Sequence, residues 1–354
     1  MAAAGRERLP EDPRQGDPGR GVRRGAEAPG RLPLAEGGRP ALKAAALLHR
    51  AESGLFLLAL SATALLPLID AIGRPLGGFH VPGSSAFCQH ATLWMAFLGG
   101  LIAARGRHHL TLSTAELLRE GAPRERARLF AMSVAAAVTA VLSWASVGLV
   151  RADREQGRLL PGGIPEWASE IVMPAALVAT ALVFAWQASS RWWGRAAALV
   201  VVGLALSLGS VPETLAPKLA LPIALLILAA ALLGAPVFVA MGGLALVLFW
   251  KDAVPVAAVS AEVYRLVASP TLPAIPLLTG AGYVLAEGGA SQRLVRFFRA
   301  LFGWMPGGLA VMVAAVCAVF TTFTGGSGVT IIALGGLVYP MLRDDDYPEG
   351  FSLG

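Results

Sequence analysis

The stretch FTTFTGGSGVTIIALGG, Phe320 to Gly336, places glycines and hydroxyl-bearing residues in the middle of an apolar run. That run extends from Ala300 to Leu342, 43 residues without one Asp, Glu, Lys or Arg. A single helix of this length would reach about 65 Å, roughly twice the hydrocarbon core of a bilayer. The run must therefore turn back, and its middle falls near Thr321, beside the glycines. The sequence predicts a re-entrant helical hairpin that enters from the cytoplasm, with its tip at about Thr321 to Gly328.

The chemistry of this tip suits a small ligand. Glycine permits positive φ and close backbone approach, and the helix ends leave amide and carbonyl groups unpaired. With the Thr and Ser hydroxyls these groups would form an oxygen-rich pocket for a small hard cation such as Na⁺, although half-helix amides could equally face an anionic substrate. Small residues also serve close helix packing in membranes. Because the run length independently demands a turn here, the pattern favours a binding site over packing alone.

The composition indicates an all-α polytopic membrane protein. Hydrophobic residues make up 55% of the chain and charged residues 15%, and the charges gather in short stretches between long uncharged ones. Several uncharged stretches meet or approach the roughly 20 residues that a spanning helix needs. Besides the run already described, they are Ser53–Ile69, Ala86–Ala104, Leu129–Val150, Ile171–Ser190, Ala196–Pro212, Leu219–Trp250 and Leu266–Ala286.

The positive net charge of +6 is best explained by membrane topology. A cytoplasmic N-terminus leaves 18 Lys and Arg residues on the inner side of the first part of the chain and 5 on the outer side, which satisfies the positive-inside rule. The sequence lacks the interleaved basic and aromatic residues of a nucleic-acid-binding surface. Cys88 and Cys317 lie in separate apolar segments and indicate packing rather than a disulfide.

Four regions follow from the pattern. Residues 1–41 form a basic, Pro- and Gly-rich tail typical of disorder. Residues 42–190 predict four spanning helices, and residues 191–217 predict a linker that crosses the membrane. Residues 218–354 are interrupted repeatedly by Gly and Pro, as in transporters whose broken helices line a binding site.

The later part of the chain contains one run with two possible folds and two short predicted helices. The run Leu219–Trp250 either folds into two short helices at Gly234-Ala235-Pro236 or follows a non-crossing linker as one long helix, and both give the same sidedness. Val256–Ala268 and Ser291–Phe302 predict interfacial helices, the first with Glu262 and Arg265 on one face.

Other polar residues in apolar surroundings indicate structural roles. Asp70 and Arg74, four residues apart, predict an interfacial ion pair. His90, His108 and His109 lack Cys or carboxylate partners at metal-ligand spacing, which favours solvated or packing roles. No phosphate loop, nucleophile elbow or zinc motif is present, so nothing supports an enzyme.

Both halves resemble one transporter family. Asp70, Arg74, PGSSAFCQHATLWMAFLGGLIAARGRHHL (Pro82–Leu110) and the four predicted spans resemble the small membrane subunit of tripartite ATP-independent periplasmic (TRAP) transporters. The segments LLGAPVFVAMGGLA and LPAIPLLTGAGYVLAEGGASQRLVRFFRALFGWMPGGLAVM (Leu272–Met312), with the opening stretch, resemble the start of their large membrane subunit. The chain therefore looks like a fused small-plus-large membrane component.

The resemblance implies a function and a fold. It implies a secondary transporter of the bacterial inner membrane that imports an organic anion, usually a carboxylate, with Na⁺ as the coupling ion. A periplasmic solute-binding protein would deliver the substrate. The second half would be part of an elevator-type transporter, in which a transport domain with two re-entrant hairpins slides against a scaffold.

The resemblance also bears on the tip. Thr324 and Gly325 match the first two positions of the family's Ser-Gly-Ser type signature near a sodium site, Gly326 replaces the second Ser, and Ser327 follows one residue later. We therefore take Thr321, Thr324, Gly325 and Ser327 as the candidate cation-binding residues.

The family's large subunit continues through a second inverted repeat, whereas this sequence stops at YPEGFSLG, which suggests a truncation that leaves half of the transport site. The alternatives to transport are a non-transporting membrane scaffold or assembly protein and, less favoured by the pattern, a channel.

Overall fold

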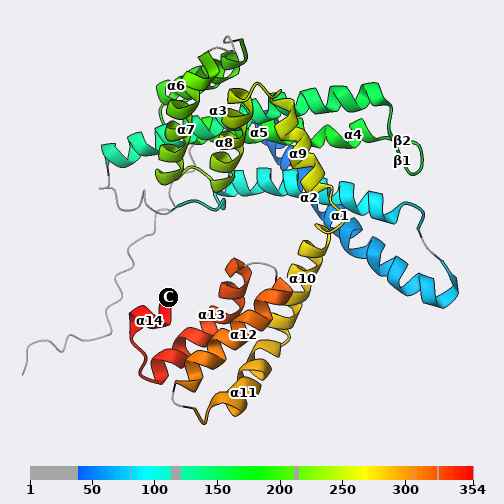
Figure 1. Ribbon diagram of the computed structural model, residues 1–354, viewed down its shortest axis with the longest axis vertical. Helices are drawn as coiled ribbons and strands as arrows, with labels where there is room; N and C mark the ends of the chain where they lie inside the picture. Colours follow the sequence, from blue (N-terminus) through cyan, green and yellow to red (C-terminus); the bar gives the residue numbers. More distant parts are fainter. Residues whose placement is uncertain are drawn as a thin grey trace, which may run out of the picture. The chain divides into compact units, whose positions relative to one another are not determined.

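The computed structural model describes residues 39–79, 81–112, 121–210, 215–305, 307–324 and 327–353. These residues are almost entirely helical (Figure 1), as the composition predicts. The β-structure among them is a two-residue antiparallel ladder that pairs Leu159 with Pro165 and Leu160 with Ile164, and an isolated bridge between Thr111 and Pro236. The tail before residue 39 lies outside the described residues.

The elements of the first part of the chain are α1 (Arg39–Gly77), α2 (Ser84–Gly106), α3 (Ala122–Gln156), β1 (Leu159–Leu160), β2 (Ile164–Pro165), α4 (Glu166–Glu170) and α5 (Val172–Gln187). They are followed by α6 (Trp192–Ser207), the 3₁₀ turn η3 (Leu208–Ser210), α7 (Ala216–Leu232), α8 (Val237–Lys251) and α9 (Ala257–Val267). The last elements are α10 (Ala274–Glu287), α11 (Ala290–Phe302), α12 (Gly308–Thr324), α13 (Ser327–Asp344) and α14 (Glu349–Leu353).

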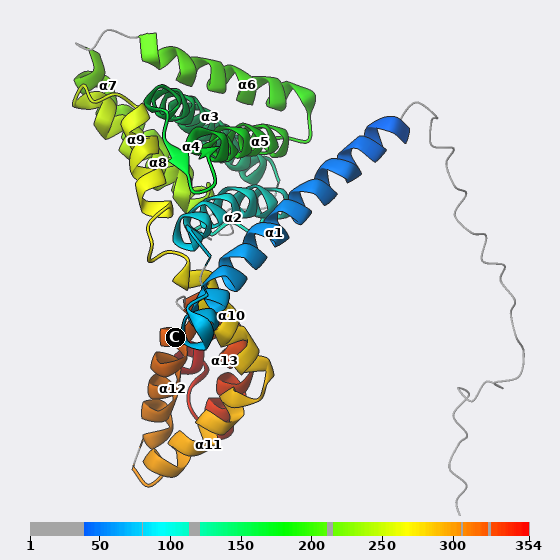
Figure 2. The ribbon, with the colours of Figure 1, turned by 90° about the vertical axis from the view of Figure 1, so that its right-hand side faces the viewer.

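Helix α3 is the centre of the first part. It packs against α5, α6, α7, α8 and α9, and Figure 2 shows α6 next to it. Ala131, Ala135 and Ala136 are completely buried on α3, because small side chains let neighbouring helices approach closely. The helix continues to Gln156, so Arg151 lies on its last turns.

Helices α1 and α2 are joined by polar contacts at both ends. Near one end Arg105 donates two hydrogen bonds to the Glu52 carboxylate, the longer at 2.8 Å. At the other, Asp70 accepts from the backbone N–H of Val81 at 2.9 Å and from the Ser84 hydroxyl. The predicted pair of Asp70 with Arg74 is present at 3.7 Å, but Asp70 also ties the end of α1 to the start of α2.

The open question about Leu219–Trp250 is settled in favour of two short helices. Helix α7 ends at Leu232, α8 begins at Val237, and the two pack against each other. Gly234 adopts φ 98°, a left-handed conformation that permits the reversal without strain. On α8, Gly243 faces Ile227 of α7 so closely that a Cβ would lie 3.0 Å from the Ile227 side chain.

The two predicted short helices are also present. Helix α9 matches Val256–Ala268, and Arg265 forms an ion pair with Glu262 at 2.8 Å. Helix α9 packs against α2, α3 and α8. Helix α11 matches the second segment and packs on α12 through the buried Val295.

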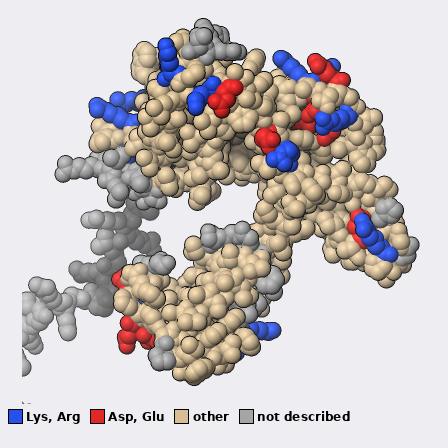
Figure 3. All heavy atoms as spheres, viewed as in Figure 1, with Lys and Arg blue, Asp and Glu red and all other residues tan. Residues whose placement is uncertain are grey.

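Four helical segments among the described residues are long and apolar enough to cross a membrane: Arg50–Leu76, Ser84–Gly106, Ala122–Gln156 and Glu166–Gln187. They coincide with the four predicted spans of the small-subunit-like half. Figure 3 shows a face that is mostly uncharged, with acidic and basic residues in small groups. Helix α6 has 16 residues, about 24 Å of helix, which is shorter than a bilayer core of about 30 Å. The crossing by residues 191–217 stays a prediction.

Candidate functional site

The predicted hairpin is formed by α12 and α13. The helices pack against each other, and the reversal falls between Thr324 and Ser327, inside the predicted tip. Phe320 and Leu334, each 1% exposed, belong to one buried cluster together with Val316. Apolar side chains on both sides of the reversal therefore hold the hairpin closed, and the length argument from the sequence is confirmed.

The described hydroxyl groups of the tip make two kinds of contact, one between the two helices and one within a helix. The Thr321 and Thr330 hydroxyls lie 3.1 Å apart, across the hairpin. The Thr330 side chain is buried, whereas Thr321 is exposed. Thr322 instead donates to the carbonyl oxygen of Ala318 in its own helix at 3.0 Å. One hydroxyl pair thus bridges the two helices just below the turn.

The remaining candidate residues fall at the break between α12 and α13. Gly325 lies outside the described residues, and so do the side chains of Thr324 and Ser327. The assignment of Thr321, Thr324, Gly325 and Ser327 to a cation site stays a prediction. Neutral hydroxyl and backbone oxygens at a helix break are the ligands that a hard monovalent cation would accept.

A second polar site joins α2, α4 and α9. His90 Nδ1 lies 3.0 Å from the Ser169 hydroxyl, and Trp94 donates its indole N–H to the Ser169 carbonyl oxygen at 3.0 Å. The Tyr264 hydroxyl donates to Glu166 at 2.5 Å. Burial, and next the Glu166 carboxylate, raise the pKa of Tyr264, so its hydroxyl remains a donor. Of the predicted solvated or packing roles, the buried His90 has a packing role, within a polar network.

This network was not predicted from the sequence. Its signal was present in Glu166 and Glu170, which are four residues apart just before an apolar segment, and in Asp153 just after another. Charged residues at the ends of spans are ordinary, so the pattern did not distinguish them from loop residues. Their partner Tyr264 lies 98 residues beyond Glu166, and only tertiary packing brings it there.

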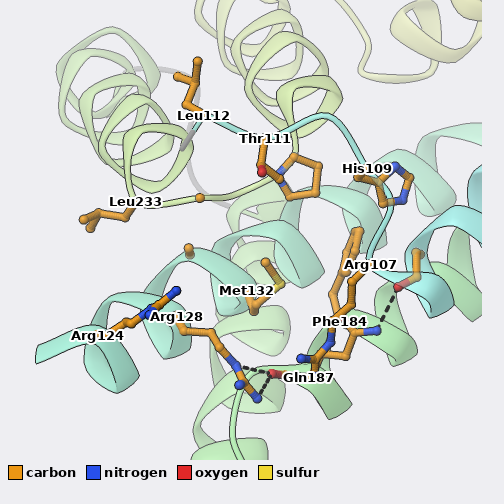
Figure 4. A pocket seen from close by; sticks show the side chains of 14 residues that line it. Arg107, His109, Thr111, Leu112, Arg124, Arg128, Met132, Phe184, Gln187 and Leu233 are labelled. Carbon is orange, nitrogen blue, oxygen red and sulfur yellow. Dashed lines mark hydrogen bonds between the residues drawn. The ribbon is translucent and has the colours of Figure 1, made fainter. Parts of the chain in front are cut away.

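A third candidate is a cavity of about 330 Å³ at the ends of α2 and α5 (Figure 4). Arg128 donates from Nε and Nη2 to the carbonyl oxygen of Gln187, at 3.0 and 2.9 Å. Gln187 in turn donates to Ala104 at 2.8 Å. The other lining residues are Arg107, His109, Thr111, Leu112, Arg124, Ala131, Met132, Phe184, Leu233, Gly234 and Pro236. Guanidinium groups above apolar walls suit an anionic group with an apolar part.

His109 stands at the wall of this cavity. Its ring centroid is 5.8 Å from that of Phe184 and 5.1 Å from that of Phe238. Burial lowers the pKa of His109, which favours the neutral ring. Of the solvated or packing roles that the sequence predicted, the ring contacts match packing.

Comparison with known proteins identifies both halves of the chain. Residues 63–195 match the family described as tripartite ATP-independent periplasmic transporters, DctQ component. Residues 221–354 match the DctM component of the same transporters. The chain belongs to the TRAP transporter family. It carries a DctQ part followed by DctM sequence in one polypeptide, as a fused small-plus-large TRAP membrane component.

Individual TRAP permeases are also similar to this chain. The C4-dicarboxylate TRAP transporter large permease protein DctM of Vibrio cholerae is 30% identical over 132 residues, which is 37% of this chain and 29% of that protein. The isethionate TRAP transporter permease protein DctMQ of Oleidesulfovibrio alaskensis is 28% identical over 120 residues, 34% of this chain and 19% of the relative. The ectoine TRAP transporter large permease protein TeaC of Halomonas elongata is 32% identical over 83 residues, 23% of this chain and 19% of the relative.

These alignments span less than a third of the length of the relatives. The named substrates also differ among them. Since the relatives are permeases, the chain is a multi-pass TRAP membrane component of the inner membrane and not an enzyme.

Proposed function

We propose that the chain is the membrane component of a sodium-coupled TRAP importer for an organic anion, most simply a carboxylate. The observation that carries the proposal is the union of DctQ and DctM sequence in one chain with a helical hairpin whose polar tip interrupts an apolar run. A tip with neutral oxygen ligands favours a monovalent cation over a free anion. The Na⁺ gradient then supplies the driving force, and the substrate is imported together with Na⁺.

The proposed sodium site lies at the reversal between α12 and α13. Thr321 contributes a hydroxyl that already faces Thr330, and Thr324, Gly325 and Ser327 complete the oxygen set. The contact with the buried Thr330 restricts the rotamers of the exposed Thr321 side chain before a cation binds. Binding therefore costs less side-chain entropy. Cation binding would draw the two helices of the hairpin together.

The proposed partner is a periplasmic solute-binding protein that delivers the substrate to the outer face. The N-terminus is proposed to be cytoplasmic, because that orientation places most Lys and Arg residues inside. The names of the relatives include C4-dicarboxylate and isethionate transporters. Organic anions are consequently the first substrates to test.

Two measurements test the proposal. The first is the melting temperature of the chain in lipid nanodiscs in NaCl and in KCl of equal ionic strength. Sodium binding predicts a higher melting temperature in NaCl, since a ligand that binds only the folded state stabilises it. The second is Na⁺-dependent uptake by proteoliposomes that contain the transporter and its binding protein.

Matched variants separate a sodium site from packing. Thr321→Ala and the double variant Thr324→Ala with Ser327→Ala should each weaken the sodium effect about tenfold or more in apparent affinity, as the loss of one ligand worth about 1.4 kcal/mol implies. Thr322→Ala is the control, because Thr322 bonds within its own helix. Equal melting temperatures in both salts and sodium-independent uptake would contradict the proposal and favour a scaffold.

A further inference from the structure

Glu170 is the last residue of α4 and one of the largest completely buried side chains, with an exposed fraction of 0%. Neither Oε1 nor Oε2 has a hydrogen-bond partner among the described residues. Buried carboxyl groups in folded proteins are nearly always paired, so this one requires a specific explanation.

The nearby acids make an ionised Glu170 still less favourable. Beyond its own burial, Glu170 has three ionisable neighbours: the carboxyl groups of Asp153 on α3 and of Glu166 one turn earlier on α4, which disfavour a charged Glu170, and the Tyr264 hydroxyl on α9, which favours it. Asp153 is itself only 4% exposed. Three carboxylates at one buried junction would repel one another in a medium that screens charge poorly.

The basic groups around this junction lie near the other two acids or an aromatic ring and not near Glu170. Arg158 lies 3.8 Å from Asp153, and the Arg154 guanidinium lies 5.4 Å from the centre of the Trp167 ring. His90 on α2 is 3.9 Å from Glu166. Helix α5, which follows Glu170, carries no Asp, Glu, His, Lys or Arg.

A bound proton resolves the arrangement. It removes one negative charge and turns a Glu170 oxygen into a donor, with Asp153 as an acceptor beside it. A metal ion fits less well, since among the described residues no three His, Cys, Asp or Glu side chains are placed to hold one. The donor set therefore suits a proton.

We propose that Glu170 is a proton-binding site whose proton is shared with Asp153, at the junction where α9 meets α2, α3 and α4. The site is independent of the sodium site at the hairpin. Glu170 lies in the part that matches DctQ, and Tyr264, which donates to the adjacent Glu166, lies in the part that matches DctM. The protonated junction holds α9 against the DctQ part, and loss of the proton weakens that contact.

The direct test is infrared difference spectroscopy of the full chain in lipid nanodiscs. The wild type should show the C=O stretch of a buried, protonated carboxylic acid at neutral pH, shifted in D₂O and lost on raising the pH. E170Q, an isosteric neutral change, should remove this band. E166Q is the matched control and should keep it. Absence of the band in the wild type, or its persistence in E170Q, would overturn the proposal.

Hydrogen exchange tests the consequence for α9. When the pH is raised across the range in which the carboxylic acid band disappears, amide exchange in α9 should become faster by about tenfold or more than the pH dependence of exchange in an unfolded chain accounts for. A shift of one pKa unit linked to opening of α9 implies this factor. In E170Q this excess should vanish. A wild-type α9 with no excess would overturn the coupling to α9.

Sodium and folding controls complete the experiment. If Na⁺ but not K⁺ removes the band at fixed pH, the junction is a cation site and the proton assignment is wrong; an unchanged band supports the proton. Should E170Q not fold, the wild-type titration alone still decides, because the band is either present or absent.

Discussion

The α12–α13 hairpin and the α4 junction both keep polar groups inside an apolar protein, but by different means. At the hairpin, two neutral hydroxyls, Thr321 and Thr330, lie 3.1 Å apart near a break between helices. At the junction, the titratable Glu170 is buried and Glu166 is half-buried, with three other helices around them. A neutral site can receive a cation without losing a proton. An acidic site carries its own charge, and its state follows the pH. The difference separates a site suited to an ion from one suited to a proton.

The largest effect is expected from the apolar support of the hairpin. Phe320→Ala should lower the free energy of unfolding by about 3 kcal/mol or more, since it leaves a cavity in the α11–α13 cluster. Chemical denaturation in micelles, followed by hydrogen exchange in α12 and α13, measures it. Ile331→Ala is the control on the same hairpin, because Ile331 is 67% exposed. Equal losses in the two variants would show that the cluster does not support the tip.

Loss of the Tyr264 hydroxyl alone should destabilise the junction. Tyr264→Phe removes the donor to Glu166 and should cost about 1–3 kcal/mol, the penalty for leaving a buried acceptor without its partner. Arg265→Gln on the same helix breaks an exposed ion pair with Glu262 and should cost about 1 kcal/mol or less. Thermal unfolding of both variants measures the difference. A smaller loss in the tyrosine variant than in the arginine variant would refute the network.

The hydroxyl pair of the hairpin should matter less to stability. Thr330→Val keeps the shape of the side chain but removes the contact with Thr321, at an expected cost of about 1 kcal/mol. Thr322→Val, the control, removes a bond within one helix turn and should be close to neutral. Both are compared by melting temperature without Na⁺. A larger loss in the control would mean that the pair does not join the helices.

The smallest effect concerns His109. Burial lowers its pKa below the ordinary value of 6.5, so the folded state binds fewer protons than the unfolded state as the pH falls toward and below that value. Stability should therefore decline on acidification through about pH 6.5, and by less in His109→Gln. Melting temperature against pH, taken as the difference between wild type and variant, isolates this residue. If the melting temperatures of wild type and His109→Gln changed equally with pH, the pKa of His109 would not be lowered by folding.

The sequence predicted what depends on length and composition. The reversal near Thr321 followed from a run too long for one crossing, and the four spans followed from uncharged segments of adequate length. The choice between one and two helices at Gly234 could not be made, because both give the same sidedness and the decision rests on packing between α7 and α8.

The sites were less accessible than the fold. Composition located a polar tip but not the rotamers that turn Thr321 toward α13 and Thr322 toward its own helix. The junction at Glu170 was missed because its members come from α2, α3, α4 and α9, and no local spacing links Asp153 to Tyr264. Contacts between distant segments are set by the shape of the packed helices.

The loop after α2 meets the reversal between α7 and α8 through main-chain atoms. Val237 donates its N–H to the carbonyl oxygen of Leu110 at 2.9 Å, and Thr111 pairs with Pro236 in an isolated antiparallel bridge. These bonds depend on backbone position, so most side-chain changes leave them intact. Side chains along this seam between the DctQ and DctM parts can therefore change while the backbone contact that aligns the two parts persists.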